Sequence, residues 1–204
     1  MAAMVENPET YFRQFIPKRD HLLTEMEAEA NRENIPLVGP VVGELLHILA
    51  RTCRAVSIVE LGTATGYSAI FLSRALNPNQ GRLITLESDP NMAERAQAQI
   101  RQAGMVPIIV VQVGDAVTIL QQMEDIFDLI FLDIEKSDYQ KVLPDCGRLL
   151  RKGGLLVADN VGFEDADPFN RSVFTSHGWS AVNLFSFLPM HSPENDGLCL
   201  ALRH

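Results

Sequence analysis

The chain has 204 residues, of which 47% are hydrophobic and 21% are charged. This length and apolar content are typical of one globular domain with a sizeable core, and no segment approaches the length of a transmembrane helix. The net charge of −9 argues against a broad phosphate-binding surface, so neither nucleic acid nor a membrane is an expected partner.

The cysteines and the first residues indicate the compartment. Cys53, Cys146 and Cys199 are far apart and odd in number, and no C-x-x-C pair occurs. This usage is typical of a reducing environment without a disulfide framework. Glu6 and Glu9 stand where a signal peptide would carry basic residues, so we expect a cytoplasmic protein.

Residues 7–34 have a helical pattern, with Pro17 in its middle. Two apolar patches flank this proline: Tyr11, Phe12, Phe15 and Ile16, then Leu22, Leu23 and Met26. We treat residues 1–34 as a segment that caps the domain, covers a substrate or pairs with a second subunit. Exposed apolar patches need burial, so a homodimer is the expected assembly.

After a loop over residues 35–40 and a helix over 41–52, strands and helices alternate. Strands are predicted at 56–61, 82–87, 107–113, 127–133 and 155–159, helices at 67–76, 90–103, 116–123, 139–150 and 168–176, and a closing strand pair at 179–188 and 198–202. The middle strands are continuous apolar runs, which indicates a doubly wound parallel sheet with helices on both faces. Ligands bind such sheets beyond the carboxyl ends of the strands.

The first strand ends in Glu60 and leads into a glycine-rich turn. Gly62 and Gly66 allow a tight turn and a close approach of a ligand, and Tyr67 and Ser68 then begin a helix. The spacing matches neither the dinucleotide motif G-x-G-x-x-G nor a P-loop. The turn therefore predicts a nucleotide-type pocket, although an ordinary strand–turn–helix corner would have a similar sequence.

A carboxylate stands at the end of each of the five predicted parallel strands or just after it: Glu60, Glu87, Asp115, Asp133 and Asp159. These charges would repel one another unless a cationic or hydroxyl-rich ligand lay between them. Glu87 lies about twenty residues beyond the glycine turn, where a carboxylate can accept both hydroxyls of a ribose. Asp115 is placed either to meet a base edge or to cap the following helix.

The remaining strand ends predict a metal site. Asp133, Asp159 and Asn160 offer three oxygen ligands from two strand ends, a set that suits Mg²⁺ or another hard divalent cation. Lys136 follows Asp133 by three residues, and a nearby dication would favour its neutral amine, the form that acts as a general base. A loop-initiating polar pair and a solvated surface lysine are the simpler interpretations of these residues.

Four segments together resemble the metal-dependent class I O-methyltransferases that include the catechol and caffeoyl-CoA enzymes. They are residues 60–68, 132–139, 153–161 and 195–198, in the order and spacing of that family. The resemblance extends from Ile35 to the C-terminus. It implies S-adenosylmethionine as methyl donor and a Rossmann-like seven-stranded sheet, mostly parallel with an antiparallel last strand.

The resemblance also implies a role for each matching residue. Val38, Glu60, Gly62, Tyr67 and Ser68 would hold the methionine part of the donor, Glu87 its ribose, and Asp115 with Ala116 its adenine. Asp133, Asp159 and Asn160 would bind the divalent metal, with Asp133 also near the donor's amino group, and Lys136 would be the catalytic base. The implied acceptor is a small aromatic compound with vicinal hydroxyl groups, like catechol.

The chain departs from the family pattern where the acceptor should lie. Phe163 stands near a position where many members carry tryptophan or another large group, and residues 189–194 form a longer turn than usual. Glu194 lies near, but out of register with, an acidic residue that contacts the acceptor in the catechol enzymes. Two other functions remain open: an NAD-dependent oxidoreductase and a non-catalytic module that binds the donor without turnover.

Overall fold

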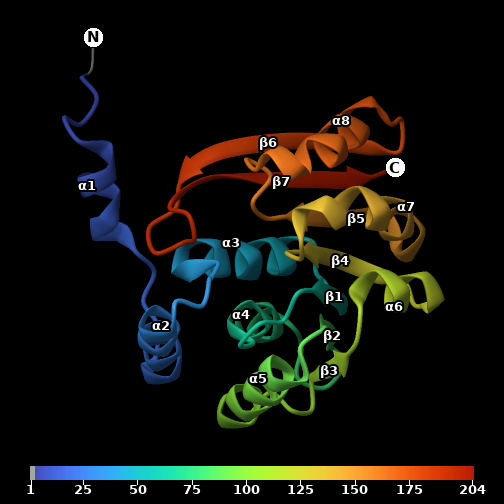
Figure 1. The fold of residues 1–204 in the computed structure, drawn as a ribbon, viewed down its shortest axis with the longest axis horizontal. Coiled ribbons are helices and arrows are strands. Elements are labelled where there is room, and N and C mark those ends of the chain that lie inside the picture. The colour runs from blue at the N-terminus through green and yellow to red at the C-terminus, as the bar shows by residue number, and fades with distance from the viewer. Residues whose placement is uncertain (1–2) are drawn as a thin grey trace.

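The computed structural model describes residues 3–204, which contain a seven-stranded sheet (Figure 1). The strands are β1 (Ser57–Leu61), β2 (Arg82–Glu87), β3 (Ile109–Val113), β4 (Phe127–Leu132), β5 (Leu150–Ala158), β6 (Trp179–Phe187) and β7 (Asn195–Arg203). Their order across the sheet is β3-β2-β1-β4-β5-β7-β6, and β7 runs antiparallel to both of its neighbours. The predicted doubly wound sheet with an antiparallel last strand is confirmed.

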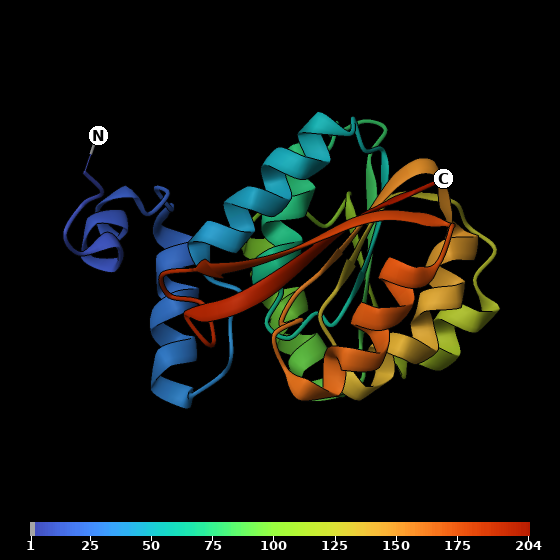
Figure 2. The ribbon, with the colours of Figure 1, turned by 90° about the horizontal axis from the view of Figure 1, so that it is seen from above.

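Helices cover both faces of this sheet (Figure 2). One face carries α3 (Gly39–Thr52), α4 (Tyr67–Ala75) and α5 (Pro90–Gln102), and the other carries α6 (Ala116–Gln122), α7 (Tyr139–Leu149) and α8 (Asp167–Thr175). Successive strand residues point to opposite faces, so Ile58 packs in the first core and Val59 in the second. Among residues 3–204, no helix is long and apolar enough to cross a membrane.

Local sequence signals explain where α5 begins and ends. The Asp89 side chain accepts a hydrogen bond from the Asn91 amide at 2.8 Å, and Pro90 occupies the first helical position. Gly104 follows the helix with a φ of +70°, a conformation that costs glycine little. These caps place the end of β2 next to the start of α5, at the edge of the sheet where a ligand is expected.

The N-terminal helical pattern is divided into three pieces: α1 (Pro8–Phe12), η1 (Arg13–Phe15) and α2 (His21–Glu33). Residues 16–20 are not helical, because Pro17 lacks an amide hydrogen and holds Ile16 in an extended conformation. Asp20 then caps α2 by accepting a hydrogen bond from the Leu23 amide at 3.0 Å. In Figures 1 and 2, α1 projects from the body of the molecule, whereas α2 lies against it.

Two strands are longer than expected. β5 begins at Leu150 rather than at residue 155, and Leu150 pairs with Phe127 ahead of an irregularity in the β4–β5 ladder. The polar and glycine residues at 151–154 conceal this extension in the sequence. β7 begins at Asn195, which pairs with Phe187 at the end of β6.

Candidate functional site

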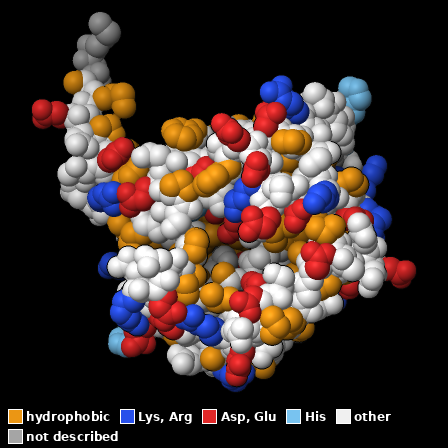
Figure 3. All heavy atoms as spheres, viewed as in Figure 1, with side chains coloured by type: hydrophobic (Ala, Val, Ile, Leu, Met, Phe, Trp, Pro, Cys, Tyr) orange, Lys and Arg blue, Asp and Glu red, His pale blue; other side chains and the backbone are white. Residues whose placement is uncertain are grey.

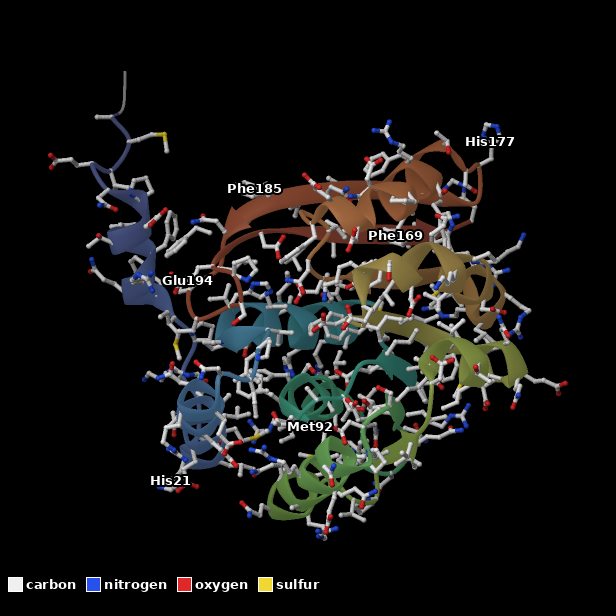
Figure 4. All side chains as sticks on the ribbon, viewed as in Figure 1. His21, Met92, Phe169, His177, Phe185 and Glu194 are labelled. Carbon is white, nitrogen blue, oxygen red and sulfur yellow. The ribbon has the colours of Figure 1, made fainter. Side chains whose placement is uncertain are left out.

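A cavity of about 410 Å³ lies at the carboxyl ends of β1, β2 and β4. Most of the predicted site residues line it: Val38, Gly62, Tyr67, Ser68, Glu87, Asp115, Ala116, Asp133 and Lys136. Met92, labelled in Figure 4, contributes to the lining from α5. Glu60, Asp159 and Asn160 are buried and do not line this cavity. Figure 3 shows a hollow near the middle of one face of the molecule, bordered by acidic and hydrophobic side chains.

The glycine turn approaches the end of β4 closely. Gly62 has a φ of +96°, and a Cβ atom there would lie 1.9 Å from the carbonyl oxygen of Asp133. The Glu87 carboxylate accepts hydrogen bonds from the amides of Ala64 (2.8 Å) and Asp89 (2.9 Å). Glu87 therefore joins the glycine turn to the end of β2, and its carboxylate lines the cavity between them.

Glu60 is a fully buried carboxylate near the end of β1. The Thr85 hydroxyl donates a hydrogen bond to its Oε2 at 2.6 Å, whereas Oε1 has no partner within residues 3–204. Burial raises the pKa of Glu60 to about 7, and the hydroxyl groups of Ser68 and Thr85 oppose this shift. Such a carboxylate is suited to a cationic partner brought by a ligand.

Asp115 caps the start of α6, one of the two roles expected from its position. Its Oδ1 accepts hydrogen bonds from the amide (2.8 Å) and the hydroxyl (2.5 Å) of Thr118, which lowers the pKa of the Asp115 carboxyl. The same residue lines the cavity, together with Ala116. The cap fixes the start of α6 and so holds both residues at the cavity wall.

Asp133 and Lys136 form an ion pair at the end of β4, with Nζ 3.1 Å from Oδ1. Both side chains are partly exposed to the cavity. Desolvation and the neighbouring Asp159 carboxylate raise the pKa of Asp133 above its usual range, and Lys136 opposes that shift. Two carboxylates thus lie close enough to repel each other, and a single lysine offsets only part of their charge.

Asp159 has a partner that the sequence did not suggest. His191 Nε2 lies 3.0 Å from Oδ1 and 2.9 Å from Oδ2 of the Asp159 carboxylate, and both side chains are almost fully buried. The ring's Nδ1 lies 2.6 Å from the carbonyl oxygen of Pro193. Burial alone would lower the pKa of His191, but the contacts with Asp159 and Pro193 leave it raised.

Asn160 is oriented by Asp196, a second buried residue without a predicted role. The Asn160 amide nitrogen Nδ2 donates to Asp196 Oδ2 at 2.6 Å, and Asp196 Oδ1 accepts the backbone amides of Gly162 and Gly197. This contact fixes which way the side-chain amide faces, and within residues 3–204 Oδ1 of Asn160 has no hydrogen-bond partner, so it could serve as an oxygen ligand. Asn160 itself has a φ of +50°, in the left-handed region.

The residues at these two strand ends fit a hard divalent cation by their chemistry. The donors are the carboxylates of Asp133 and Asp159, which repel each other, and the amide oxygen of Asn160. Within residues 3–204, no three His, Cys, Asp or Glu side chains converge closely enough to hold a metal by themselves. A cation here would depend on the asparagine and on oxygen atoms of water or substrate.

The sequence offered a faint signal for only some of the missed residues. His191 lies in the turn that is longer than usual, and Asp196 lies in a motif used only for the family resemblance. Thr85 lies within an apolar strand and gave no signal. Their roles depend on contacts between segments far apart in the chain, which spacing does not show.

Sequence comparison finds that residues 18–167 match the O-methyltransferase family. The catechol O-methyltransferase of Niastella koreensis is 45% identical over 128 residues, covering 61% of this chain and 58% of that protein. The catechol O-methyltransferase of Sus scrofa is 34% identical over 175 residues, covering 82% of this chain and 92% of that protein. The chain spans little more than half the length of the relatives from Niastella koreensis and Mycobacterium tuberculosis, at 58% and 54%.

Comparison with solved structures also finds O-methyltransferases. The O-methyltransferase TomG from Streptomyces achromogenes, in complex with SAM, superposes with a TM-score of 0.86 at 30% identity and covers 96% of this chain and 95% of its own. An O-methyltransferase from Bacillus cereus, in complex with SAH, also has a TM-score of 0.86, at 27% identity, with 96% of each chain covered.

Proposed function

Because this chain belongs to the O-methyltransferase family, we propose that it transfers the methyl group of S-adenosylmethionine to an oxygen atom of a small aromatic acceptor with vicinal hydroxyl groups, with the aid of a divalent cation. The observation that carries this proposal is that the residues after β4 lie close to those after β5. The ion pair of Lys136 with Asp133 lies beside Asp159 and Asn160, at the edge of a cavity of suitable size.

The donor would occupy the 410 Å³ cavity. We assign the ribose to Glu87, because its carboxylate lines the cavity while it holds the glycine turn. The adenine would lie against Asp115 and Ala116, and the methionine part against Val38, Gly62, Tyr67 and Ser68. Glu60, with one unpartnered oxygen, and Asp133 would favour the donor's ammonium group.

The oxygen ligands of Asp133, Asp159 and Asn160 would hold the cation, either Mg²⁺ or another divalent ion. When bound, the cation would lower the pKa of the acceptor hydroxyl and orient it. The chain's own contribution is to fix these ligands: Asp196 orients the Asn160 amide, and the Tyr139 hydroxyl donates to the carbonyl of Asp159 at 2.9 Å. These two contacts hold Asn160 and Asp159 in position.

We assign the removal of the acceptor's hydroxyl proton to Lys136. Its neutral amine would take the proton of the acceptor hydroxyl, while the methyl group moves in line from sulfur to oxygen. The S–CH₃ bond breaks, the O–CH₃ bond forms, and the sulfur keeps the electron pair. Asp133 then accepts an N–H of the resulting ammonium group, as it does in the present ion pair.

A transfer assay tests this proposal. The protein is incubated with labelled S-adenosylmethionine, Mg²⁺ and a panel of catechols, with and without a chelator. We expect transfer that the chelator and Asp159→Ala abolish. Transfer that neither treatment changes would remove the metal mechanism. Saturable donor binding without transfer to any dihydroxy acceptor would instead support a non-catalytic module, and binding of NAD in place of the donor would support an oxidoreductase.

We also propose that the protein is a homodimer of a reducing, cytoplasmic compartment. Tyr11, Phe12 and Phe15 pack against one another on the projecting N-terminal segment and are 40%, 55% and 61% exposed, so that a second subunit would have an apolar surface to cover. Figure 4 places Glu194 opposite this segment, and Arg13 forms an ion pair with it. The three free cysteines are compatible with reducing conditions.

A further inference from the structure

The imidazole of His191 covers the carboxylate of Asp159. Nε2 lies at nearly equal distances, 3.0 and 2.9 Å, from its two oxygens. Oδ1 also accepts the amide hydrogen of Asn160 at 2.9 Å. Nε2 of His191 and the amide of Asn160 therefore already contact this carboxylate from within the protein, on the residue that a cation would need.

The loop that carries His191 holds the ring in this position. Nδ1 contacts the Pro193 carbonyl at 2.6 Å, and the His191 amide donates to the Leu188 carbonyl at 3.0 Å. The loop is tied to the residues before α3, because the Ser192 amide donates to the carbonyl of Leu37 at 3.2 Å. The ring is almost fully buried, so its contact with Asp159 belongs to the packed structure rather than to a mobile surface side chain.

The two ring nitrogens of His191 have different partners. Nδ1 faces the carbonyl oxygen of Pro193, and Nε2 faces the two carboxylate oxygens of Asp159. In addition, His191, Asp133 and Asp159 do not converge as a metal-binding group within the described part of the chain.

We propose that His191 is an internal competitor of the divalent cation: its ring occupies Asp159 in the cation-free protein and leaves the carboxylate when a cation binds. This inference rests on the proposed metal-dependent function and adds a residue that sets the affinity of the site. Nε2 of the ring contacts both oxygens of a carboxylate that otherwise faces Asp133, so Asp159 has a partner in the folded protein without a metal. The cation must overcome this contact before it can bind.

The test measures cation binding without donor or acceptor. Mn²⁺ is titrated into the full chain at one pH, and free Mn²⁺ is followed by electron paramagnetic resonance, with calorimetry as a second readout. His191→Ala should bind Mn²⁺ about tenfold more tightly than the unmodified protein, since one charge-assisted hydrogen bond no longer competes. His177→Ala is the matched control, because His177 is exposed; its Mn²⁺ affinity should be unchanged.

A measurement on the unmodified protein covers the case in which His191→Ala folds poorly. Mg²⁺ is titrated while the ring nitrogens of ¹⁵N-labelled histidine are followed by NMR. The His191 signals should shift and saturate with the cation, while those of His177 stay constant.

Each outcome decides the question. Equal Mn²⁺ affinities with and without the ring, or His191 signals that do not move, would overturn the inference while leaving the metal-dependent function intact. Weaker binding by His191→Ala would identify His191 as a ligand and would also overturn it. If neither protein bound Mn²⁺, the metal mechanism of the proposed function would fail, and the inference with it.

Discussion

The hydroxyl of Tyr67 donates a hydrogen bond to Oε1 of Glu27 at 2.5 Å and so joins α4 to the N-terminal helix α2. Glu27 also accepts a hydrogen bond from Arg19 Nε at 2.9 Å. Burial and the Glu27 carboxylate raise the pKa of Tyr67 well above its usual value. Because Tyr67 lines the cavity, α2 supports the wall of the candidate donor site.

Removing this hydroxyl should loosen α2. We expect Tyr67→Phe to lower the free energy of unfolding by about 1–2 kcal/mol, because a buried oxygen of Glu27 loses a partner. Urea denaturation measures this change. Tyr11→Phe is the matched control, since Tyr11 is 40% exposed. The free energy of unfolding of this variant should stay within about 0.5 kcal/mol of that of the unmodified protein. Equal stability losses in the two variants would contradict the structural role of the Tyr67–Glu27 contact.

Glu60 should make stability depend on pH. Its pKa is about 7 in the folded protein against an ordinary value of 4.5, so the unfolded chain releases this proton first as the pH rises. Glu60 therefore lowers stability progressively between these two pH values, by up to about 3 kcal/mol above pH 7. Glu60→Gln removes the titration and should stabilise the protein more at pH 8 than at pH 4.5.

The measurement for Glu60 is urea denaturation of both proteins at the two pH values. A stability difference that is the same at pH 4.5 and pH 8 would mean that the buried carboxyl does not titrate in this range. The same variant should bind S-adenosylhomocysteine more weakly by calorimetry, if the Glu60 carboxylate attracts the ligand's ammonium group as proposed.

Lys136→Met should leave the donor site intact and impair chemistry. We expect kcat to fall by about 10²–10⁴-fold, the range lost when a general base is removed, while the affinity for S-adenosylhomocysteine stays within about threefold. Lys141→Met is the control, because Lys141 is an exposed lysine on α7 that pairs with Asp138, the residue just before that helix. A comparable fall in kcat for both variants would show that the loss is not specific to Lys136.

Glu87→Gln should weaken donor binding. Gln keeps an acceptor for only part of the present contacts with Ala64 and Asp89, and it removes the charge that would accept the ribose hydroxyls. We expect the Kd for S-adenosylhomocysteine to rise by about tenfold or more in calorimetry. Glu94→Gln, on the exposed side of α5, should leave the Kd unchanged; an equal change in both would exclude a specific ribose contact.

The N-terminal segment should decide the oligomeric state. Replacing Tyr11, Phe12 and Phe15 together by serine removes the exposed aromatic cluster, and we expect a dimer to become a monomer in light scattering at micromolar concentration. Thermal unfolding provides the check on folding, because these side chains are 40%, 55% and 61% exposed and should contribute little to the stability of a monomer. An unmodified protein that is already monomeric would contradict the proposed dimer.

The sequence predicted the sheet and the edge at which the cavity lies because these features depend on local signals. Continuous apolar runs predicted buried parallel strands, and the carboxylates at their ends predicted where a ligand lies. The caps at Asp89 and Gly104 fixed α5 in the same way. The early start of β5 was missed because its glycines and charges pair with β4 at an irregularity, which only the neighbouring strand reveals.

By itself, the sequence therefore determined the architecture, the glycine turn and the residue types at each strand end, since all of these follow from patterns a few residues long. Tertiary structure alone decided what those side chains face. It placed His191 on Asp159, Asp196 on Asn160 and Glu27 on Tyr67, through contacts between segments 32, 36 and 40 residues apart. Spacing along the chain carries no information about such contacts, because they form only when loops and helices pack against the finished sheet.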